Sequence, residues 1–169
     1  MPGIDAINAL DAGAFSRLLG PVYEHSPWIA ERAFARRPFA TPRDLHLALY
    51  GVVLAATEAE QLALLNAHPE LAGKEAEAGA LTAASRQEQG SAGLDRLTRE
   101  ELATLANGNA RYRERFGFPF IIAVRLHSRA SIFAALEGRF HNTRAQELQN
   151  AIAQVGEIAR LRLAALIPS

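Results

Sequence analysis

The chain has 169 residues, of which 49% are hydrophobic and 21% are charged, and its 18 acidic side chains balance 18 Lys and Arg. This length is enough for one domain with a substantial core, and the balanced charge argues against bulk attraction to nucleic acid or to an anionic membrane. The chain has no cysteine, which excludes disulfides, thiolate metal ligands and cysteine nucleophiles. Any chemistry must therefore use histidine, carboxylates, arginine or hydroxyls.

The N-terminal stretch MPGIDAINAL has neither a basic leader nor the apolar core of a signal peptide. No apolar run approaches the roughly 20 residues that span a bilayer. We therefore expect a soluble, cytoplasmic protein that binds neither a membrane nor nucleic acid.

Helix start signals recur along the chain and predict an all-α, single-domain bundle of about seven to nine helices over residues 1–169. Ser26 and Thr41 are each followed by proline, which places a polar N-cap before the first helical position. These two signals predict helices that run to about Arg36 and about Ala56.

Two further helices begin with capping boxes, because Thr57 and Thr98 each precede a glutamate by three residues. The first helix should stop at about His68, where the following proline opposes helical geometry. The second should run to about Phe116 and end at Gly117.

The remaining elements are an apolar segment and two helices. The segment from Gly117 to Val124 has a strand-like composition but no obvious pairing partner, so we interpret it as a buried extended stretch that leads into a short helix. A helix is predicted for 128–140, and Thr143 opens the last one. Its apolar face comprises Leu148, Ile152, Val155, Ile158, Leu161 and Leu163.

Three clusters could carry chemistry, and the first is HPELAGK, which places His68 at a predicted helix end. The negative end of the helix dipole favours a protonated imidazole, which suits a proton donor or a partner for a carboxylate. A histidine that merely ends a helix is the alternative. No two of His25, His46, His68, His127 and His141 have the spacing of a zinc site, so no metal is predicted.

The second cluster is SRQEQ, in which Ser85, Glu88 and Gln89 lie three and four residues apart and share a face if the segment is helical. The same spacing of Ser85 and Glu88 could instead be a capping box. The third cluster is RERFGFPFIIAVR, whose irregular backbone could present N–H groups to a ligand or could simply be core.

The ordered set HPELAGK, SRQEQ with AGLDRLT, and YRERFGFPFIIAV resembles the family of 2-oxo-4-hydroxy-4-carboxy-5-ureidoimidazoline (OHCU) decarboxylases, as does LGPVYEHSPWIAERA. The resemblance implies an all-helical, cofactor-free, homodimeric enzyme of urate breakdown that converts OHCU to (S)-allantoin and CO2. Alternatives are an enzyme of the same fold that acts on another oxidised nitrogen heterocycle, and a non-catalytic helical binding module.

The resemblance also implies roles for individual residues. The catalytic residues would be His68, Glu88 and Arg162, with Arg160 as the second choice for the arginine. The substrate-binding residues would be Pro69, Ser85, Gln89, Phe120, Ile121, Ile122, Ala123 and Val124. Two positions depart from the family pattern: Glu70 replaces an aspartate, and Gly108 stands where an apolar residue is expected.

Overall fold

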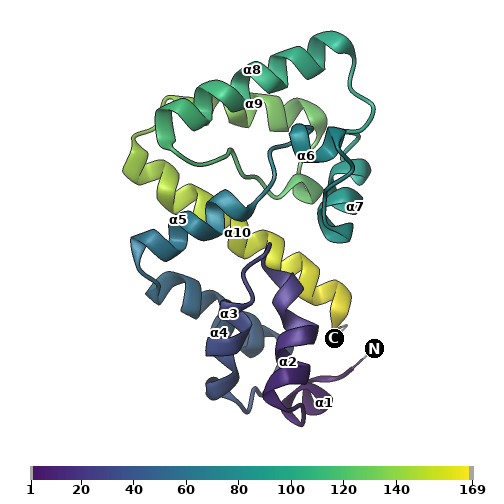
Figure 1. The fold of residues 1–169 in the computed structure, drawn as a ribbon, viewed down its shortest axis with the longest axis vertical. Coiled ribbons are helices and arrows are strands. Elements are labelled where there is room, and N and C mark those ends of the chain that lie inside the picture. Colours follow the sequence, from purple (N-terminus) through teal and green to yellow (C-terminus); the bar gives the residue numbers. More distant parts are fainter. Residues whose placement is uncertain (1, 168–169) are drawn as a thin grey trace. The chain divides into compact units, whose positions relative to one another are not determined.

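The computed structural model describes residues 2–167, which form helices and loops without a strand in that range (Figure 1). Two compact units are present: one comprises the chain up to Ala67 together with the chain from Gly156 onward, and the other comprises His68–Val155. The last helix is continuous along the chain from the second unit into the first. The all-α prediction is therefore confirmed.

The first unit contains the N-terminal helices and the end of the last helix. Its elements are α1 (Ile4–Asn8), α2 (Ala12–Leu19), η1 (Gly20–Val22), α3 (Trp28–Ala33), η2 (Phe34–Arg36), α4 (Pro42–Ala55), α5 (Glu58–Ala67) and the end of α10 (Arg144–Leu166). Helix α3 packs against both α2 and α4. The side chains of Phe15, Leu19, Ile29, Leu45 and Leu49 are fully buried in this unit.

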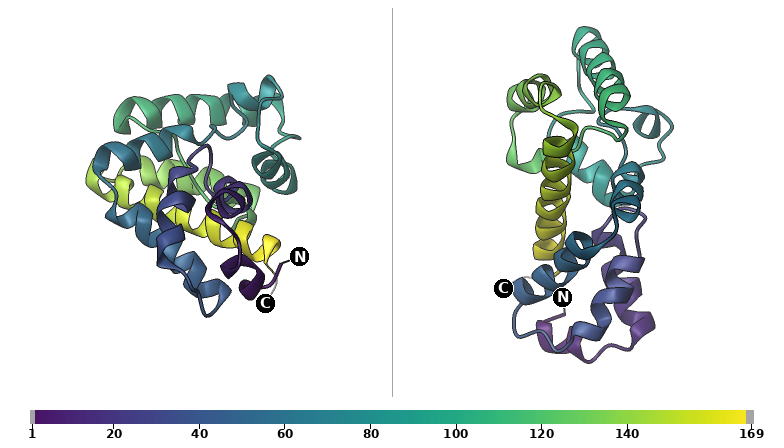
Figure 2. Two further views of the ribbon diagram at one scale, coloured as in Figure 1. Left: turned by 60° about the horizontal axis from the view of Figure 1, so that its bottom comes forward. Right: turned by 90° about the vertical axis from the view of Figure 1, so that its left-hand side faces the viewer.

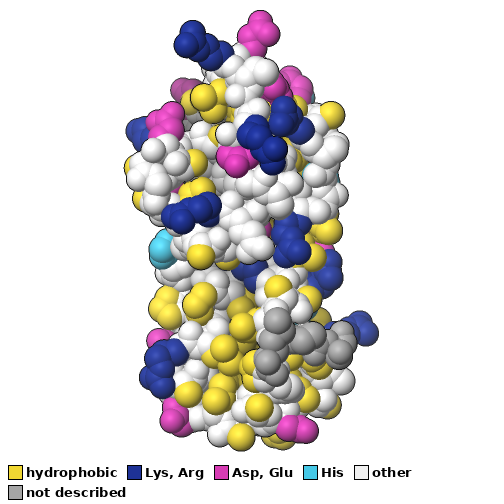
Figure 3. Space-filling view, turned by 90° about the vertical axis from the view of Figure 1, so that its right-hand side faces the viewer, with side chains coloured by type: hydrophobic (Ala, Val, Ile, Leu, Met, Phe, Trp, Pro, Cys, Tyr) yellow, Lys and Arg dark blue, Asp and Glu magenta, His cyan; other side chains and the backbone are white. Residues whose placement is uncertain are grey.

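The second unit contains α6 (Lys74–Glu77), α7 (Ala83–Ser91), α8 (Arg99–Phe116), η3 (Val124–Leu126), α9 (Arg129–Phe140) and the start of α10. Helices α8 and α9 lie side by side (Figures 1 and 2). The rings of Tyr112, Phe116, Phe118 and Phe120 form an aromatic cluster with centroid distances of 4.6 to 6.2 Å. Acidic and basic side chains are interspersed over the face of this unit drawn in Figure 3.

The local capping signals account for most helix starts. Thr41 caps α4 through the N–H of Asp44, and Thr98 forms the full reciprocal capping box with Glu101. Gly117 ends α8 with a φ of 84°, a left-handed conformation that glycine adopts without strain. Thr143 and Gln146 also form a reciprocal pair at the start of α10. These boundaries are confirmed because capping depends on neighbouring residues alone.

The predicted cap at Ser26 is wrong, whereas the predicted helix end at about Arg36 agrees with the end of the helical stretch. The Ser26 hydroxyl donates to the carbonyl of Glu24 (2.8 Å) instead of capping a helix. The helix begins at Trp28 and tightens into the short 3-10 turn η2 after Ala33. The described residues form ten α-helices, more than the seven to nine expected, and α1 and α6, with five and four residues, are too short to produce a periodic signal.

The apolar face predicted for α10 is only partly buried. Ile152, Val155 and Leu163 are buried, whereas Leu148, Ile158 and Leu161 are half-buried. Glu147 lies on the buried side of the same helix and is fully inaccessible to solvent. No pattern in the sequence indicated this buried carboxylate.

Hydropathy along the helices is moderate. Within the described residues, no single helix has both the length and the apolar character of a membrane span. Helices α4 and α5 together have that length and apolar character, but the chain bends by 117° between them.

Candidate functional site

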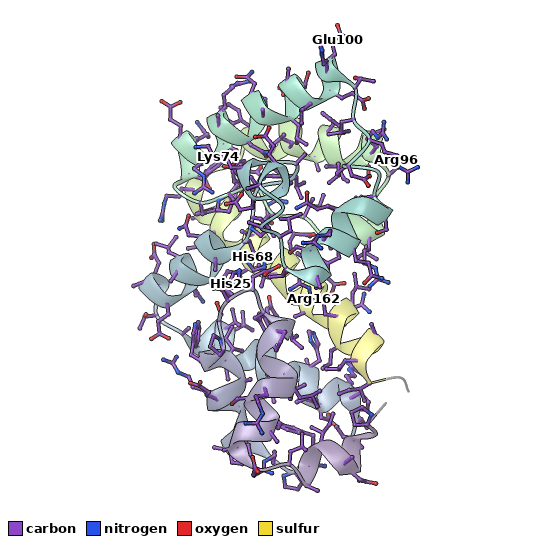
Figure 4. The ribbon with its side chains drawn as sticks, turned by 45° about the vertical axis from the view of Figure 1, so that its right-hand side comes forward. His25, His68, Lys74, Arg96, Glu100 and Arg162 are labelled. Carbon is purple, nitrogen blue, oxygen red and sulfur yellow. The ribbon has the colours of Figure 1, made fainter. Side chains whose placement is uncertain are left out.

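His68 directly follows the last residue of α5, where Pro69 prevents the helix from continuing, as predicted (Figure 4). Its side chain is buried, with an exposed fraction of 7%. A buried histidine at a helix end is better placed for a specific contact than a solvated one, because the protein determines its surroundings.

The loop that follows His68 is held by three side chains from two helices. The Ala72 N–H donates to Gln89 Oε1 (2.9 Å), Asn109 Nδ2 donates to the Leu71 carbonyl (3.0 Å), and Arg113 Nε donates to Glu70 Oε1 (2.8 Å). These bonds keep Ala72 in a left-handed conformation with φ 48°, which costs a non-glycine residue on the order of 1 kcal/mol. The histidine loop, residues 68–73, is therefore fixed rather than free to relax.

The two positions that depart from the pattern of the resembled family lie in this region of the structure. Glu70, in place of aspartate, is the carboxylate that pairs with Arg113. Gly108 lies in α8 where a Cβ atom would stand 2.5 Å from Cδ2 of Leu136 on α9. The glycine therefore allows the close approach of the two helices.

Helix α7 presents the second cluster, and the structure settles its local geometry. The N-cap is Thr82, which accepts from the Ser85 N–H (3.2 Å), so the alternative of a Ser85–Glu88 capping box is wrong. Ser85 and Gln89 are buried, with exposed fractions of 5% and 6%, while Glu88 is half-buried. All three lie on one face of the helix, as their spacing predicted.

Gln89 joins this helix to the histidine loop through its bond to Ala72. Its carbonyl oxygen therefore already accepts a hydrogen bond from the protein. Its amide nitrogen donates to none of the described residues. The structure therefore brings α7 together with the loop that begins at His68. The direct pairing of His68 with Glu88 stays a prediction.

Within the third cluster, residues 118–123 are extended and buried before the chain enters η3, as predicted for the segment from Gly117 to Val124. Phe120 to Val124 have exposed fractions of 1 to 5%. Helix α7 contacts η3, so the end of this segment neighbours the helix that carries Ser85 and Gln89. The Ala123 N–H donates to Gln154 Oε1 (2.9 Å), so it is not available to a ligand.

Arg162 lies on α10 in the first unit, where it pairs with Glu24, which was not among the predicted site residues. Its Nη2 donates to Glu24 Oε1 (3.0 Å), and the two side chains have exposed fractions of 8% and 1%. Arg160, the second choice, is 47% exposed and pairs with Glu157 on its own helix. This contrast favours Arg162 as the arginine of a site.

Glu24 could have been noticed as an acidic residue inside the motif LGPVYEHSPW, which the resemblance used without assigning a role to the glutamate. It precedes His25, whose φ of 45° is left-handed. The structure also identifies Arg139 and Glu147 as a buried pair, for which the sequence offered no comparable signal. Among residues 2–167, no group of three His, Cys, Asp or Glu side chains is placed to hold a metal ion.

Comparison with known proteins decides the family. The model of the OHCU decarboxylase family matches residues 8–164. The chain belongs to the OHCU decarboxylase family. The family match covers both compact units, so all the site residues above fall within it.

Two relatives within the family are similar to this chain over nearly their whole length. The chain is 44% identical over 161 residues to the 2-oxo-4-hydroxy-4-carboxy-5-ureidoimidazoline decarboxylase of Haloferax volcanii, with 95% of this chain and 94% of that protein covered. It is 41% identical to the protein of the same name from Halalkalicoccus jeotgali, covering 95% and 89% of the two chains. The solved structure of an (S)-allantoin synthase superimposes with a TM-score of 0.77 at 30% identity, covering 98% of this chain and 54% of that one.

Proposed function

We propose that this protein decarboxylates OHCU to (S)-allantoin and CO2 in urate degradation. Membership of the OHCU decarboxylase family is the observation that carries the proposal. The buried His68 and the buried face of α7 supply the polar groups that such a reaction needs.

The chemistry begins with the cleavage of the bond between the ring carbon and the carboxylate. The electron pair left behind moves toward the adjacent C=N bond of the ring, and negative charge spreads through its nitrogen onto the 2-oxo oxygen. The ring nitrogen and the carbon that bears the ureido group each gain a proton, and the neighbouring hydroxyl loses one as it becomes a carbonyl, so one proton is taken up overall. The substrate thus carries its own electron sink, which supports a reaction without a cofactor.

In this proposal His68 is the acid and base that transfers protons at the hydroxyl and the ring, and Glu88 orients it or contacts the substrate. Arg162 would orient an anionic or carbonyl group of the substrate, and Pro69 would line the pocket. A donor fixed on one face of the planar intermediate delivers its proton to that face only, which accounts for a single allantoin enantiomer.

Ser85 and the amide nitrogen of Gln89 would hold the polar groups of the ureido arm and the ring. The segment from Phe120 to Val124 would line the pocket, with the amides of Ile121 and Ile122 as donors. Ala123 contributes its side chain and backbone surface alone, because its N–H is bonded to Gln154.

We propose that the protein acts as a single domain over 1–169 and as a cytoplasmic homodimer. The match of one family model to residues 8–164 supports the single domain, and the dimer and location rest on the family resemblance. Leu47 and Leu54 support an interface on α4, since they lie seven residues apart on one face and are 51% and 57% exposed. Light scattering on the wild type and on Leu47→Glu tests this assembly: a monomeric wild type would refute it.

The decisive experiment generates OHCU in situ from urate with the two preceding enzymes and follows optically active allantoin by circular dichroism. Faster appearance of the (S)-enantiomer with this protein is expected. Equal rates with and without it would refute the decarboxylase assignment. A pocket that binds allantoin without accelerating its formation would instead indicate a non-catalytic module, and turnover of a different heterocycle would indicate another substrate.

A further inference from the structure

The buried carboxylate of Glu147 gathers four hydrogen-bond donors in the second unit. Oε1 accepts from the Tyr112 hydroxyl (2.5 Å) and Arg139 Nε (2.9 Å), and Oε2 accepts from Asn142 Nδ2 (2.9 Å) and Asn150 Nδ2 (2.6 Å). Replacing a buried ion pair with apolar packing often leaves stability unchanged or higher, so stability alone does not account for this network. Its bond to Nε holds the guanidinium group of Arg139 in one orientation.

Arg139 carries the constraint from Glu147 to the segment that lines the site. Its Nη1 donates to the Ile121 carbonyl (2.7 Å), and its guanidinium carbon lies 4.6 Å from the centroid of the Phe120 ring. Because the guanidinium group is a rigid plane, the Nε bond to Glu147 sets the direction in which Nη1 points. One arginine thus fixes both a backbone carbonyl and an aromatic ring of the segment.

Fixing the Ile121 carbonyl also fixes the N–H of Ile122. The two groups belong to one trans peptide plane, in which carbonyl and N–H point in opposite directions. The Ile122 N–H therefore faces away from Arg139, and it donates to none of the described residues although Ile122 is only 4% exposed. An unsatisfied buried N–H is costly, so this donor is suited to an acceptor supplied by a ligand.

We propose that Arg139 and Glu147 are positioning residues that aim the Ile122 N–H at the substrate oxygen on which charge develops as CO2 leaves. The inference rests on the proposed function, which supplies that oxygen, the 2-oxo group of the ring. A backbone donor aimed in advance at a developing oxyanion stabilises the transition state more than the ground state. A variant in which the Ile122 N–H is no longer held in this orientation should therefore have a lower kcat and an almost unchanged KM.

Arg139→Lys and Glu147→Gln test the proposal, because lysine lacks the planar fork and glutamine lacks the second acceptor oxygen. The chain offers a matched control on the same helix: Arg129 pairs with Glu101 (3.3 Å) and donates to the Gly93 carbonyl (3.2 Å). We expect kcat to fall about tenfold to a hundredfold in the two test variants, with KM changed less than about threefold. Arg129→Lys and Glu101→Gln should keep the wild-type kcat.

Rates are compared at a temperature where far-UV circular dichroism shows every variant folded, and Glu147→Asp replaces Glu147→Gln if the latter does not fold. Wild-type kcat in the test variants, or an equal loss in the controls, would overturn the positioning role alone. Absence of OHCU turnover by the wild type would overturn the proposed function as well.

A second readout addresses the donor directly. In protein labelled with 15N at isoleucine, the Ile122 amide proton should shift when (S)-allantoin is added, and the shift should be at least halved in Arg139→Lys. The proposed orientation of the Ile122 N–H would be refuted if its amide proton did not shift in the wild type, or shifted equally in Arg139→Lys.

Discussion

The buried pair formed by Glu24 and Arg162 leads to the sharpest prediction about the first unit. Glu24→Gln keeps the size of the side chain but removes its charge, so the Arg162 guanidinium stays in a site where the two side chains are only 1% and 8% exposed. A buried charge without its charged partner is unfavourable, and an arginine cannot lose its proton to become neutral. The free energy of unfolding must therefore fall.

The magnitude follows from burial. Removing one partner of a buried ion pair costs about 3 to 5 kcal/mol, and the lower end applies because the glutamine oxygen can still accept from Arg162. About 3 kcal/mol corresponds to a fall in Tm of about 9 °C for a chain of this size. The pair Arg160–Glu157, two residues away on α10, is 47% and 42% exposed, and Glu157→Gln should cost less than about 1 kcal/mol.

Urea and thermal unfolding followed at 222 nm measure both variants against the wild type. Turnover in the coupled allantoin assay should fall about tenfold in Glu24→Gln, since Arg162 loses the partner that orients it. The reasoning is refuted if the two variants lose equal stability, or if Glu24→Gln stays within 1 kcal/mol of the wild type.

Three further predictions concern the second unit. His68→Asn should fold like the wild type by circular dichroism and nearly abolish turnover, and a wild-type rate would end its assignment as the proton-transferring residue. Gly108→Ala should gain about 1 kcal/mol of helix propensity but lose about 2 kcal/mol against Leu136, so the net loss is about 1 kcal/mol in urea unfolding; a clear gain would contradict the close approach of α8 and α9. Burial raises the pKa of Glu147, but hydrogen bonds from Asn142, Tyr112 and Asn150 and the Arg139 charge outweigh burial and hold this pKa below its usual range. Its carboxylate therefore stabilises the fold above the unfolded pKa of about 4.3, and this contribution is lost as the pH falls through the folded pKa. The difference in free energy of unfolding between the wild type and Glu147→Gln should accordingly narrow below about pH 4. A difference that stays constant with pH would contradict a lowered pKa of Glu147 in the folded protein.

The sequence predicted the features that depend on neighbouring residues. The capping box at Thr98, the helix start at Thr143, the stop at Pro69 and the turn at Gly117 each involve groups within four residues of one another, so the chain specifies them locally. Ser26 failed as a cap because its hydroxyl found another acceptor two residues away. A cap signal states a preference, and a competing local bond can override it.

The contacts that organise the site are non-local, which is why the sequence did not indicate them. Tyr112 and Glu147 are 35 residues apart, and Ala72 and Gln89 are 17 apart. Glu147 stands in the first turn of α10, a position typical of an exposed acidic residue that favours the helix dipole, so nothing local distinguishes it as buried. The family resemblance selected residues for contact with the substrate and left out those that hold the backbone behind them.

The bond between Ala72 and Gln89 has a consequence for the timescale of the site. The Ala72 amide hydrogen can exchange with solvent deuterium only when Gln89 releases it, so its exchange rate reports how often the histidine loop opens. A slow rate would mean that the loop opens only with the unfolding of α7 or α8. The lifetime of the catalytic arrangement would then equal that of the packed helices, and the loop would need no motion of its own between one turnover and the next.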